Sequence, residues 1–174
     1  MFPDLVPVLA ARLPPDVLLD GELIAWDTAA GRLDFAGLQA RMTAGRRLAD
    51  ATARRPAQLV CFDVLAVGSA DLRSRPLAER RGELERLLAG AGSPIVLCQQ
   101  TADAAVASEW LRTLTAGGLE GVVIKDARRP YPIRSGQRAW RVDCTNGVAD
   151  DDSVARSDRV ATWMMSSGAC AVEA

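Results

Sequence analysis

The sequence contains no histidine and only one lysine. The absence of histidine excludes Ser-His-Asp and Cys-His catalysis and every metal site built on imidazole. Twenty of the 21 basic residues are arginine, and Lys125 is the single lysine. Biased codon usage in a GC-rich genome is a sufficient cause of this preference. Any chemistry that needs a lysine amine therefore depends on Lys125.

Closely spaced cysteines and long apolar runs are also missing. The four cysteines are far apart and form no Cys-x-x-Cys pair, which predicts reduced thiols rather than disulfides or a thiolate zinc site. No apolar run approaches the ~20 residues of a membrane helix, and no basic and then apolar leader opens the chain. We therefore expect a soluble, cytoplasmic protein with no membrane partner.

The 174 residues, 49% of them apolar, suffice for one domain with its own core. The charge is unevenly distributed along them. Residues 1–141 contain 19 basic and 16 acidic side chains, whereas residues 142–174 contain 2 and 6. From Asn146 onward no sustained hydrophobic period remains, and three aspartates follow one another at 150–152. We therefore predict a folded, mildly basic body over 1–141 and a divergent, disordered acidic tail over 142–174.

Hydrophobic periodicity predicts a mixture of helices and strands, and hence an α+β fold. A proline at the start, a leucine face and a following glycine define the helix over 76–89 most clearly. The continuous apolar run over 58–67 is typical of a buried strand. Further helices are expected over 2–13, 35–42 and 102–116, further strands over 17–26, 33–35, 95–99, 121–126 and 138–142, and a surface helix or loop over 46–55.

Two motifs place acids inside strand patterns. The first is Asp20-Gly21-Glu22, whose simplest explanation is a β-bulge or turn with two surface acids. The second is Phe62-Asp63, inside the buried strand. A carboxylate there costs several kcal/mol unless it is paired or ligated. We expect Asp63 at a strand end, near a base or a cation.

The third motif is Glu120-Gly121-Val122-Val123-Ile124-Lys125. Alternation along a strand puts Glu120 and Lys125 on opposite faces, so both could meet one ligand only if Glu120 lies just before the regular strand. Taken alone, this motif indicates an ordinary edge strand. The three motifs in order nevertheless supply what a nucleoside triphosphate needs: carboxylates for Mg²⁺, an aromatic ring for the base and a lysine for a phosphate.

On these residues the chain resembles the adenylation domain of ATP-dependent DNA ligases, a family of covalent nucleotidyltransferases. Three segments carry the resemblance, which covers roughly residues 1–141: LLDGELIAWD, LVCFDVLAVGSADLRSRPLAERRGELERLL and LEGVVIKDARRPYPIRSGQRAW. It implies mixed, largely antiparallel sheets with flanking helices, the ATP-grasp-like nucleotidyltransferase fold. An oligonucleotide-binding barrel usually follows that domain.

The resemblance also implies roles for four residues. Glu22 would contact the ribose or organise a metal, Phe62 would stack on adenine, Glu120 would bind the catalytic Mg²⁺, and Lys125 would lie near the α-phosphate of ATP. In this family a lysine attacks ATP to give a lysyl-AMP. The AMP then passes to a DNA 5′-phosphate and is displaced by the 3′-hydroxyl of the nick. The implied partner is nicked double-stranded DNA, and the implied setting is DNA repair and recombination.

Two departures qualify the resemblance. The nucleophile motif Lys-x-Asp-Gly is missing, which predicts a domain that is incomplete at its N-terminus and inactive alone. In the motif Trp-x-Lys-x-Lys, Trp140 fits but Val142 and Cys144 replace the lysines, an abrupt change that a frameshift or a truncated reading frame would produce. We expect a partial ligase with low stability, or with self-association through an incomplete sheet.

Two alternatives remain open. The chain could be a non-catalytic nucleotide- or DNA-binding remnant that places arginines on phosphates, namely Arg46, Arg47, Arg54, Arg55, Arg128 and Arg129. Any one of these arginines could equally be an ordinary solvated side chain. The chain could also be an unrelated α+β domain in which the motifs occur by chance, so that Glu22, Phe62, Glu120 and Lys125 do not converge.

Overall fold

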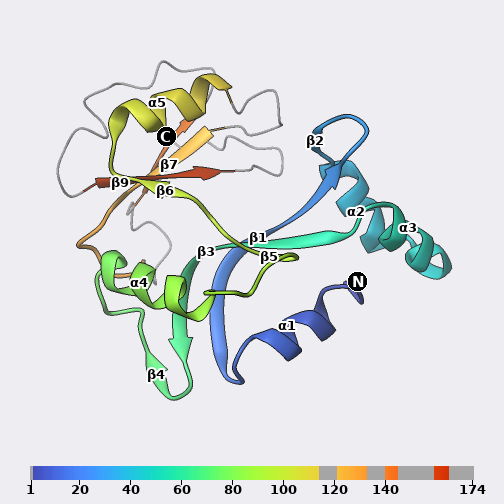
Figure 1. Cartoon of the computed structure of the whole chain (residues 1–174), viewed down its shortest axis with the longest axis horizontal. Coiled ribbons are helices and arrows are strands. Elements are labelled where there is room, and N and C mark those ends of the chain that lie inside the picture. The colour runs from blue at the N-terminus through green and yellow to red at the C-terminus, as the bar shows by residue number, and fades with distance from the viewer. Residues whose placement is uncertain (1, 114–120, 133–139, 145–158, 165–174) are drawn as a thin grey trace. The chain divides into compact units, whose positions relative to one another are not determined.

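The computed structural model describes residues 2–113, 121–132, 140–144 and 159–164 (Figure 1). The chain divides into two compact units. Met1–Leu72 and Arg80–Leu97 form the first, and Arg73–Glu79 and Cys98–Ala174 form the second. Strands and helices occur in both units, and most strand pairs are antiparallel. The prediction of an α+β fold with mixed, largely antiparallel sheets is confirmed.

The first unit is built on two long antiparallel strands, β1 (Val17–Asp27) and β3 (Ala57–Val67). The short strands β2 (Arg32–Leu33) and β4 (Ala70–Asp71) extend this sheet in the order β2-β1-β3-β4. Strand β5 (Ile95–Leu97) pairs with β3 in the parallel direction. The apolar run that predicts a buried strand over 58–67 is therefore the centre of the sheet.

Two helices cover one face of this sheet, α1 (Val6–Arg12) and α4 (Leu77–Leu87). Leu9 of α1 and Leu84 of α4 pack against the sheet residues Cys61 and Val64. Leu84, Cys61 and Val64 are fully buried. Each such aliphatic side chain contributes about 1.5–3 kcal/mol when it is removed from water, so this cluster is the main core of the first unit.

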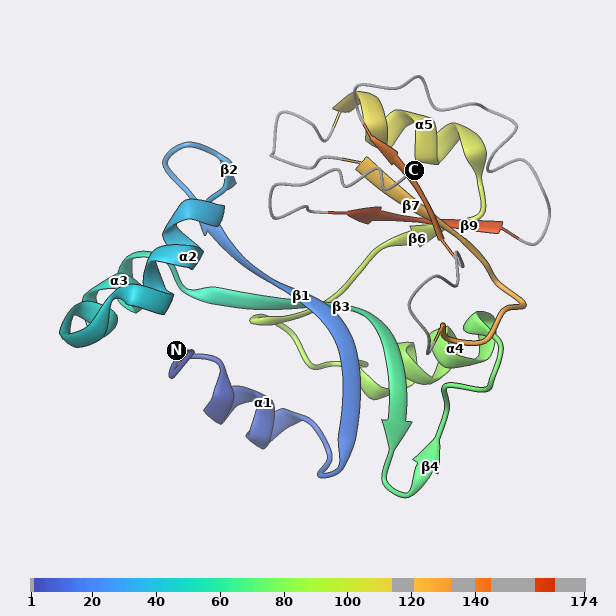
Figure 2. The ribbon, with the colours of Figure 1, turned by 180° about the vertical axis from the view of Figure 1, so that it is seen from behind.

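Between β2 and β3 the chain forms a small helical arm. It consists of α2 (Phe35–Thr43), the single 3-10 turn η1 (Gly45–Arg47) and α3 (Leu48–Arg54). The arm lies at the end of the β1–β3 pair where Ala25 and Ala57 are partners, as both ribbon views show (Figures 1 and 2). A second, smaller cluster of Ala25, Ala57 and Leu38 joins it to the sheet.

The second unit contains helix α5 (Ala104–Thr113) and a four-stranded sheet. Its strands are antiparallel and run in the order β6-β9-β7-β8. Their bounds are Gln100–Thr101 for β6, Gly121–Asp126 for β7, Trp140–Cys144 for β8 and Arg159–Met164 for β9. Residues 127–131 also bond through the backbone to the segment 73–79, with Leu77 N donating to Arg129 O and Tyr131 N donating to Arg73 O.

The range 142–174, predicted as a disordered tail, includes β9 and most of β8. For residues 159–164 that prediction is wrong, because they pair with β7 over its whole length. The remainder of the range, from 145 to 158 and from 165 to 174, lies outside the described residues. A division of the chain at residue 141 stays a prediction.

Candidate active site

The Asp20-Gly21-Glu22 motif lies in β1, at a point where the backbone of β3 leaves no room for a side chain on Gly21. A Cβ atom added at Gly21 would lie 2.6 Å from the carbonyl oxygen of Val60 and 3.2 Å from the Cα of Cys61. Only glycine fits this position. Alternation along the strand puts Asp20 and Glu22 together on the face opposite to Gly21. Both acids are half-buried, and the register of the strand pair shifts between Asp20 and Gly21.

The bulge is on β3. Asp20 pairs with Asp63, but Gly21 pairs with Cys61, so Phe62 is an extra residue with no partner on β1. A bulge of this kind redirects a side chain out of the regular pleat. The structure thus brings Glu22 and Phe62 onto adjacent strands, within a few residues of the same irregularity. Phe62 is half-buried.

Asp63 forms a buried ion pair with Arg80 of α4. Arg80 Nε donates to Asp63 Oδ1 and Arg80 Nη2 donates to Asp63 Oδ2, both at 2.8 Å. The backbone N–H of Val64 also donates to Oδ1. The side chains are 1% and 3% exposed, so the expected partnership with a base is confirmed. The expected position at a strand end is wrong, because the bidentate arginine lets the carboxylate lie inside β3.

Lys125 lies in the second unit, on β7. Its backbone pairs with Trp140 of β8 on one side and with Val160 of β9 on the other. Strand β7 is therefore central, and the alternative of an edge strand is wrong. The side chain of Lys125 is 5% exposed. Glu120, which directly precedes β7, lies outside the described residues, and the convergence of Glu22, Phe62, Glu120 and Lys125 on one ligand stays a prediction.

The arginines predicted to contact DNA are distributed over both units. Arg46 and Arg47 are exposed in η1. Arg128 and Arg129, which follow β7, are exposed and lie 3.8 and 3.6 Å from the carboxylate of Asp126. These four residues stay predictions as DNA contacts.

Arg55 differs from these four arginines because its side chain joins parts of the first unit through two ion pairs. Its Nε donates to Asp34 at 2.8 Å and its Nη2 donates to Asp27 at 2.6 Å. The hydrogen bond to Asp34 raises the pKa of the Arg55 guanidinium. Asp34 also caps α2 by accepting from Gly37 N at 2.7 Å. Arg55 thereby ties the end of α3 to the start of α2 and to the end of β1.

Sequence reasoning missed two buried arginines. Arg80 lies four residues before Leu84 on α4. This spacing could have predicted that Arg80 lies on the apolar face of the helix. Arg41 lies three residues after the buried Leu38 on α2, so the same spacing applies to it. Its Nη2 donates to Asp4 at 2.7 Å, and its guanidinium lies 5.4 Å from the centre of the Phe2 ring. Arg41 thus holds the segment before α1 against α2.

Neither a clustered metal site nor a membrane segment is found in the described part of the chain. No group of three or more cysteine, aspartate or glutamate side chains there is close enough to hold a metal ion. Among the helices described, none combines the length and the apolar character that crossing a membrane requires.

Comparison with known proteins extends the resemblance found in the motifs. The ATP dependent DNA ligase domain matches residues 1–141. DNA ligase C2 of Mycolicibacterium smegmatis is 38% identical over 131 residues, and DNA ligase C of Mycobacterium tuberculosis is 38% identical over 138 residues. Each match covers 75% of this chain, and the chain spans 36% and 37% of the length of these two relatives.

A probable DNA ligase of Streptomyces griseus is 34% identical over 143 residues, which are 80% of this chain and 28% of that relative. The family match spans the three motifs and both long strands of the first unit. An unrelated α+β domain with chance motifs is thereby excluded. The chain belongs to the ATP-dependent DNA ligase domain family.

Proposed function

We propose that this chain binds ATP as a portion of a ligase adenylation domain, and that it does not form a lysyl-AMP by itself. The observation that carries the proposal is the irregularity shared by β1 and β3. The close approach at Gly21 and the extra residue Phe62 put an acid and an aromatic ring on adjacent strands of a tightly packed pair. Rigid strands position such groups more accurately than loops do.

Each side chain then has a role in binding. The ring of Phe62 offers a flat apolar surface for adenine, and the carboxylate of Glu22 accepts a hydrogen bond from a ribose hydroxyl. Oxygen ligands of this type also suit Mg²⁺, which Glu22 would hold together with Glu120. That ion would offset negative charge on the phosphates. The ammonium of Lys125 would do the same at the α-phosphate.

The chain offers no nucleophile for the covalent step. Its single lysine is followed by Asp126-Ala127, which does not match the motif Lys-x-Asp-Gly. Arginine cannot replace lysine, because a guanidinium stays protonated in proteins and is a poor nucleophile. Lysyl-AMP formation therefore needs a lysine that is not among these 174 residues.

We propose that this chain takes part in a complete reaction that joins nicked DNA. Support comes from the relatives, which are named as DNA ligases, although the chain spans just over a third of the first two. The partner would be nicked duplex DNA, the compartment the cytoplasm, and the setting DNA repair and recombination.

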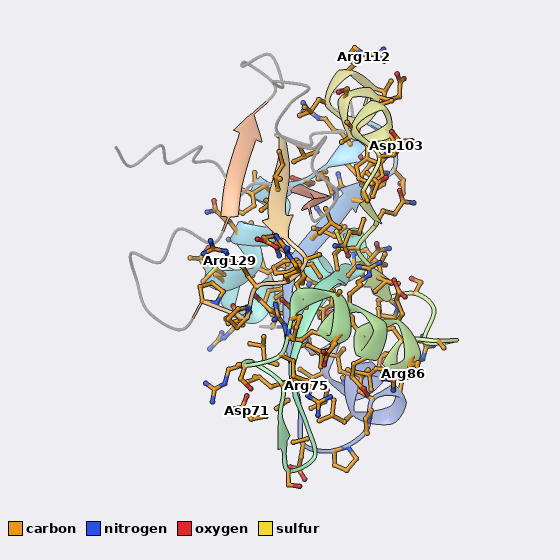
Figure 3. All side chains as sticks on the ribbon, turned by 90° about the vertical axis from the view of Figure 1, so that its left-hand side faces the viewer. Asp71, Arg75, Arg86, Asp103, Arg112 and Arg129 are labelled. Carbon is orange, nitrogen blue, oxygen red and sulfur yellow. The ribbon has the colours of Figure 1, made fainter. Side chains whose placement is uncertain are left out.

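Two measurements test the proposal. Isothermal titration with ATP and Mg²⁺ is expected to show binding that weakens in Phe62→Ala and in Glu22→Gln. Arg86→Gln is the control, because Arg86 lies on the exposed face of α4 with its side chain 70% exposed (Figure 3). Incubation with ATP labelled at the α-phosphate, followed by a denaturing gel, is expected to leave the chain unlabelled. A covalent adduct would overturn the claim about the nucleophile, and absence of ATP binding would overturn the proposal as a whole.

The second candidate is a non-catalytic DNA-binding remnant. The exposed arginines of η1 and α3 favour it, because they lie outside the β1–β3 irregularity. Salt-dependent DNA binding by a chain that does not bind ATP would identify this case.

A further inference from the structure

The side chains of β3 change their alternation inside the strand, at the residues that form the bulge. Cys61 and Val64 are both fully buried in the core cluster that contains Leu84 of α4. They are three residues apart, whereas side chains on one face of a regular strand are an even number of residues apart. The alternation therefore reverses between them, at Phe62 and Asp63, as the register of the strand pair also shows.

Phe62 and Asp63 both lie on the face that carries the acids of β1. Asp63 is paired directly with Asp20, and residues directly opposite each other on antiparallel strands share a face. Among the described residues, the half-buried apolar side chains that pack on the core cluster include Leu59 of β3 but not Phe62. The bulge therefore places the ring of Phe62 and the carboxylate of Asp63 on the same face as Glu22.

Neighbouring strands do not hold this part of β3 on the side away from β1. Strand β5 pairs with β3 only as far as Cys61, and β4 pairs with it from Ala66 onward, so residues 62–65 have no strand partner on that side within the described ranges. Helix α4 reaches β3 in this interval, because Arg80 donates two hydrogen bonds to Asp63. The carboxylate also accepts the backbone N–H of the following residue, so one acid joins the helix to the main chain directly after the bulge.

The ion pair determines where the extra residue of β3 lies. If the bulge moved by one residue, Phe62 would pair with Asp20 in place of Asp63. Asp63 would then become the extra residue, and its carboxylate would leave the position in which Arg80 donates to both of its oxygens. The two side chains are 1% and 3% exposed, so such a shift would leave buried charges unpaired. Burial of this kind specifies one register against its neighbours.

We propose that Arg80 is a positioning residue for ATP binding, which acts by holding Asp63 and thereby fixing the bulge that aims the ring of Phe62 at adenine. This inference rests on the proposed function in one respect, namely that Phe62 stacks on the base. Arg80 acts without touching the nucleotide, because its side chain is 3% exposed. A ring held at a fixed angle loses less conformational freedom on stacking than a mobile one, so the ion pair raises the affinity by pre-organisation.

The test measures the stack itself, with the full chain, ATP and Mg²⁺. The ring current of an aromatic side chain moves the proton resonances of a stacked base upfield, so the resonances of adenine H2 and H8 are recorded at saturating protein. Isothermal titration gives the affinity in parallel. Phe62→Ala is the reference, and it is expected to lose the upfield shift and to weaken ATP binding about 5- to 100-fold, the range for loss of one base–aromatic stack.

Two variants remove the anchoring of Asp63 and keep the core filled. Asp63→Leu/Arg80→Met replaces the pair by apolar side chains, which proteins tolerate in place of a buried ion pair. This double variant is expected to bind ATP about fivefold more weakly, the lower end of the range for one stack, and to show a smaller upfield shift. Arg80→Lys keeps a cation beside Asp63 but cannot donate two parallel hydrogen bonds from a planar group. It is expected to change both quantities in the same direction, and it carries the test alone if the double variant does not fold.

Leu84→Val is the matched control. It alters the face of α4 that packs on β3 but leaves both charges of the ion pair in place. It is expected to lower the free energy of unfolding and to keep the wild-type upfield shift at saturation. An equal loss of the upfield shift in Leu84→Val would overturn the proposal, since a general loosening of the core would then explain the effect.

The remaining outcomes distinguish the positioning role from the function on which it rests. Wild-type shifts and affinity in the folded variants of the ion pair, with the effect of Phe62→Ala intact, would overturn the positioning role and leave ATP binding standing. A variant that binds more weakly but keeps the full upfield shift would also overturn it, because the affinity would then have been lost elsewhere in the site. A wild-type chain that binds no ATP, or whose H2 and H8 resonances do not respond to Phe62→Ala, would overturn the stacking role of Phe62 and the positioning role with it.

Discussion

At the scale of single residues, Gly21 and Gly82 show that glycine has no uniform meaning. Gly21 is in contact with the backbone of the neighbouring strand, whereas a Cβ at Gly82, inside α4, would meet nothing within 4 Å. The same substitution therefore has opposite consequences at the two positions. One position is restricted by packing, and the other retains only the entropic cost of glycine in a helix.

We expect Gly21→Ala to destabilise the protein by about 1–3 kcal/mol, because the added methyl group forces β1 and β3 apart. Gly82→Ala is expected to stabilise it by up to about 1 kcal/mol, the difference in helix propensity. Urea denaturation followed by circular dichroism measures both. Equal effects of the two substitutions would contradict the close approach at Gly21.

The Asp63–Arg80 pair is a second feature of this scale. Arg80→Met removes the base that neutralises a carboxylate only 1% exposed, and it is expected to cost about 3–5 kcal/mol in the free energy of unfolding. The double variant Asp63→Leu/Arg80→Met is expected to recover much of that loss, because neither charge of the pair then remains buried. Arg86→Ala breaks an exposed pair and should change stability by less than about 1 kcal/mol. If the double variant is as unstable as Arg80→Met alone, the loss of stability does not come from an unpaired buried charge.

At the scale of elements, the carboxylate of Asp4 holds the segment before α1 in place. Asp4 Oδ2 accepts hydrogen bonds from Arg41 Nη2 at 2.7 Å and from the backbone N–H of Ala57 at 2.9 Å. Burial would raise the pKa of Asp4, but these hydrogen bonds outweigh burial and lower the pKa below 3.8. The ionised form therefore stabilises the fold. This contribution is present above the unfolded-state pKa and is lost as the pH falls through the lower folded-state pKa.

Asp4→Asn is accordingly expected to reduce stability at neutral pH and to matter less as the solution becomes acidic. The difference in the free energy of unfolding between wild type and variant should be constant well above pH 3.8 and shrink below it. Thermal or urea denaturation over a pH series gives this difference directly. A difference that persists unchanged in strong acid would mean that Asp4 acts through packing rather than through its charge.

The elements themselves were largely readable from the sequence. The strands over 17–27, 57–67 and 121–126 have β-branched or apolar runs of strand length, and the helix over 77–87 has a proline start and a leucine face. Asp63 was misplaced because a strand interior tolerates a carboxylate only when a base reaches it from another element, which no local pattern reveals. Residues 159–164 were missed because they form a strand by pairing with β7, which is distant in the sequence. The candidate site was predictable as motifs, but the bulge at Phe62 depends on the register between two strands.

At the scale of the whole chain, two sheets with separate edges determine how copies could associate. In the second unit β8 is the last strand of its sheet, with β7 on one side and no further strand paired to it in the described part of the chain. An edge of this kind can pair with a strand from another molecule. The expected self-association therefore stays a prediction, and the structure offers this edge for it.

Sedimentation velocity over a range of protein concentrations is expected to show a concentration-dependent shift from monomer to larger species. The shift should persist under reducing conditions, because pairing through a strand edge needs no disulfide. Burial also raises the pKa of the Cys61 thiol to about 11. A thiol of that pKa is a poor nucleophile for disulfide formation near neutrality. A single monomeric boundary at every concentration would contradict the prediction.

The contact at Gly21 has a consequence for how this architecture can vary between relatives. Where two backbones touch, their spacing is set by main-chain atoms and not by the volume of any side chain. Leucines and valines on the helix-covered face can thus be exchanged for other aliphatic residues, with the helices moving to fit, while the opposite face keeps its dimensions. In such a strand pair the side chains of the core can change while the face with Asp20 and Glu22 keeps its geometry. Side-chain volume determines the first, and main-chain contact determines the second.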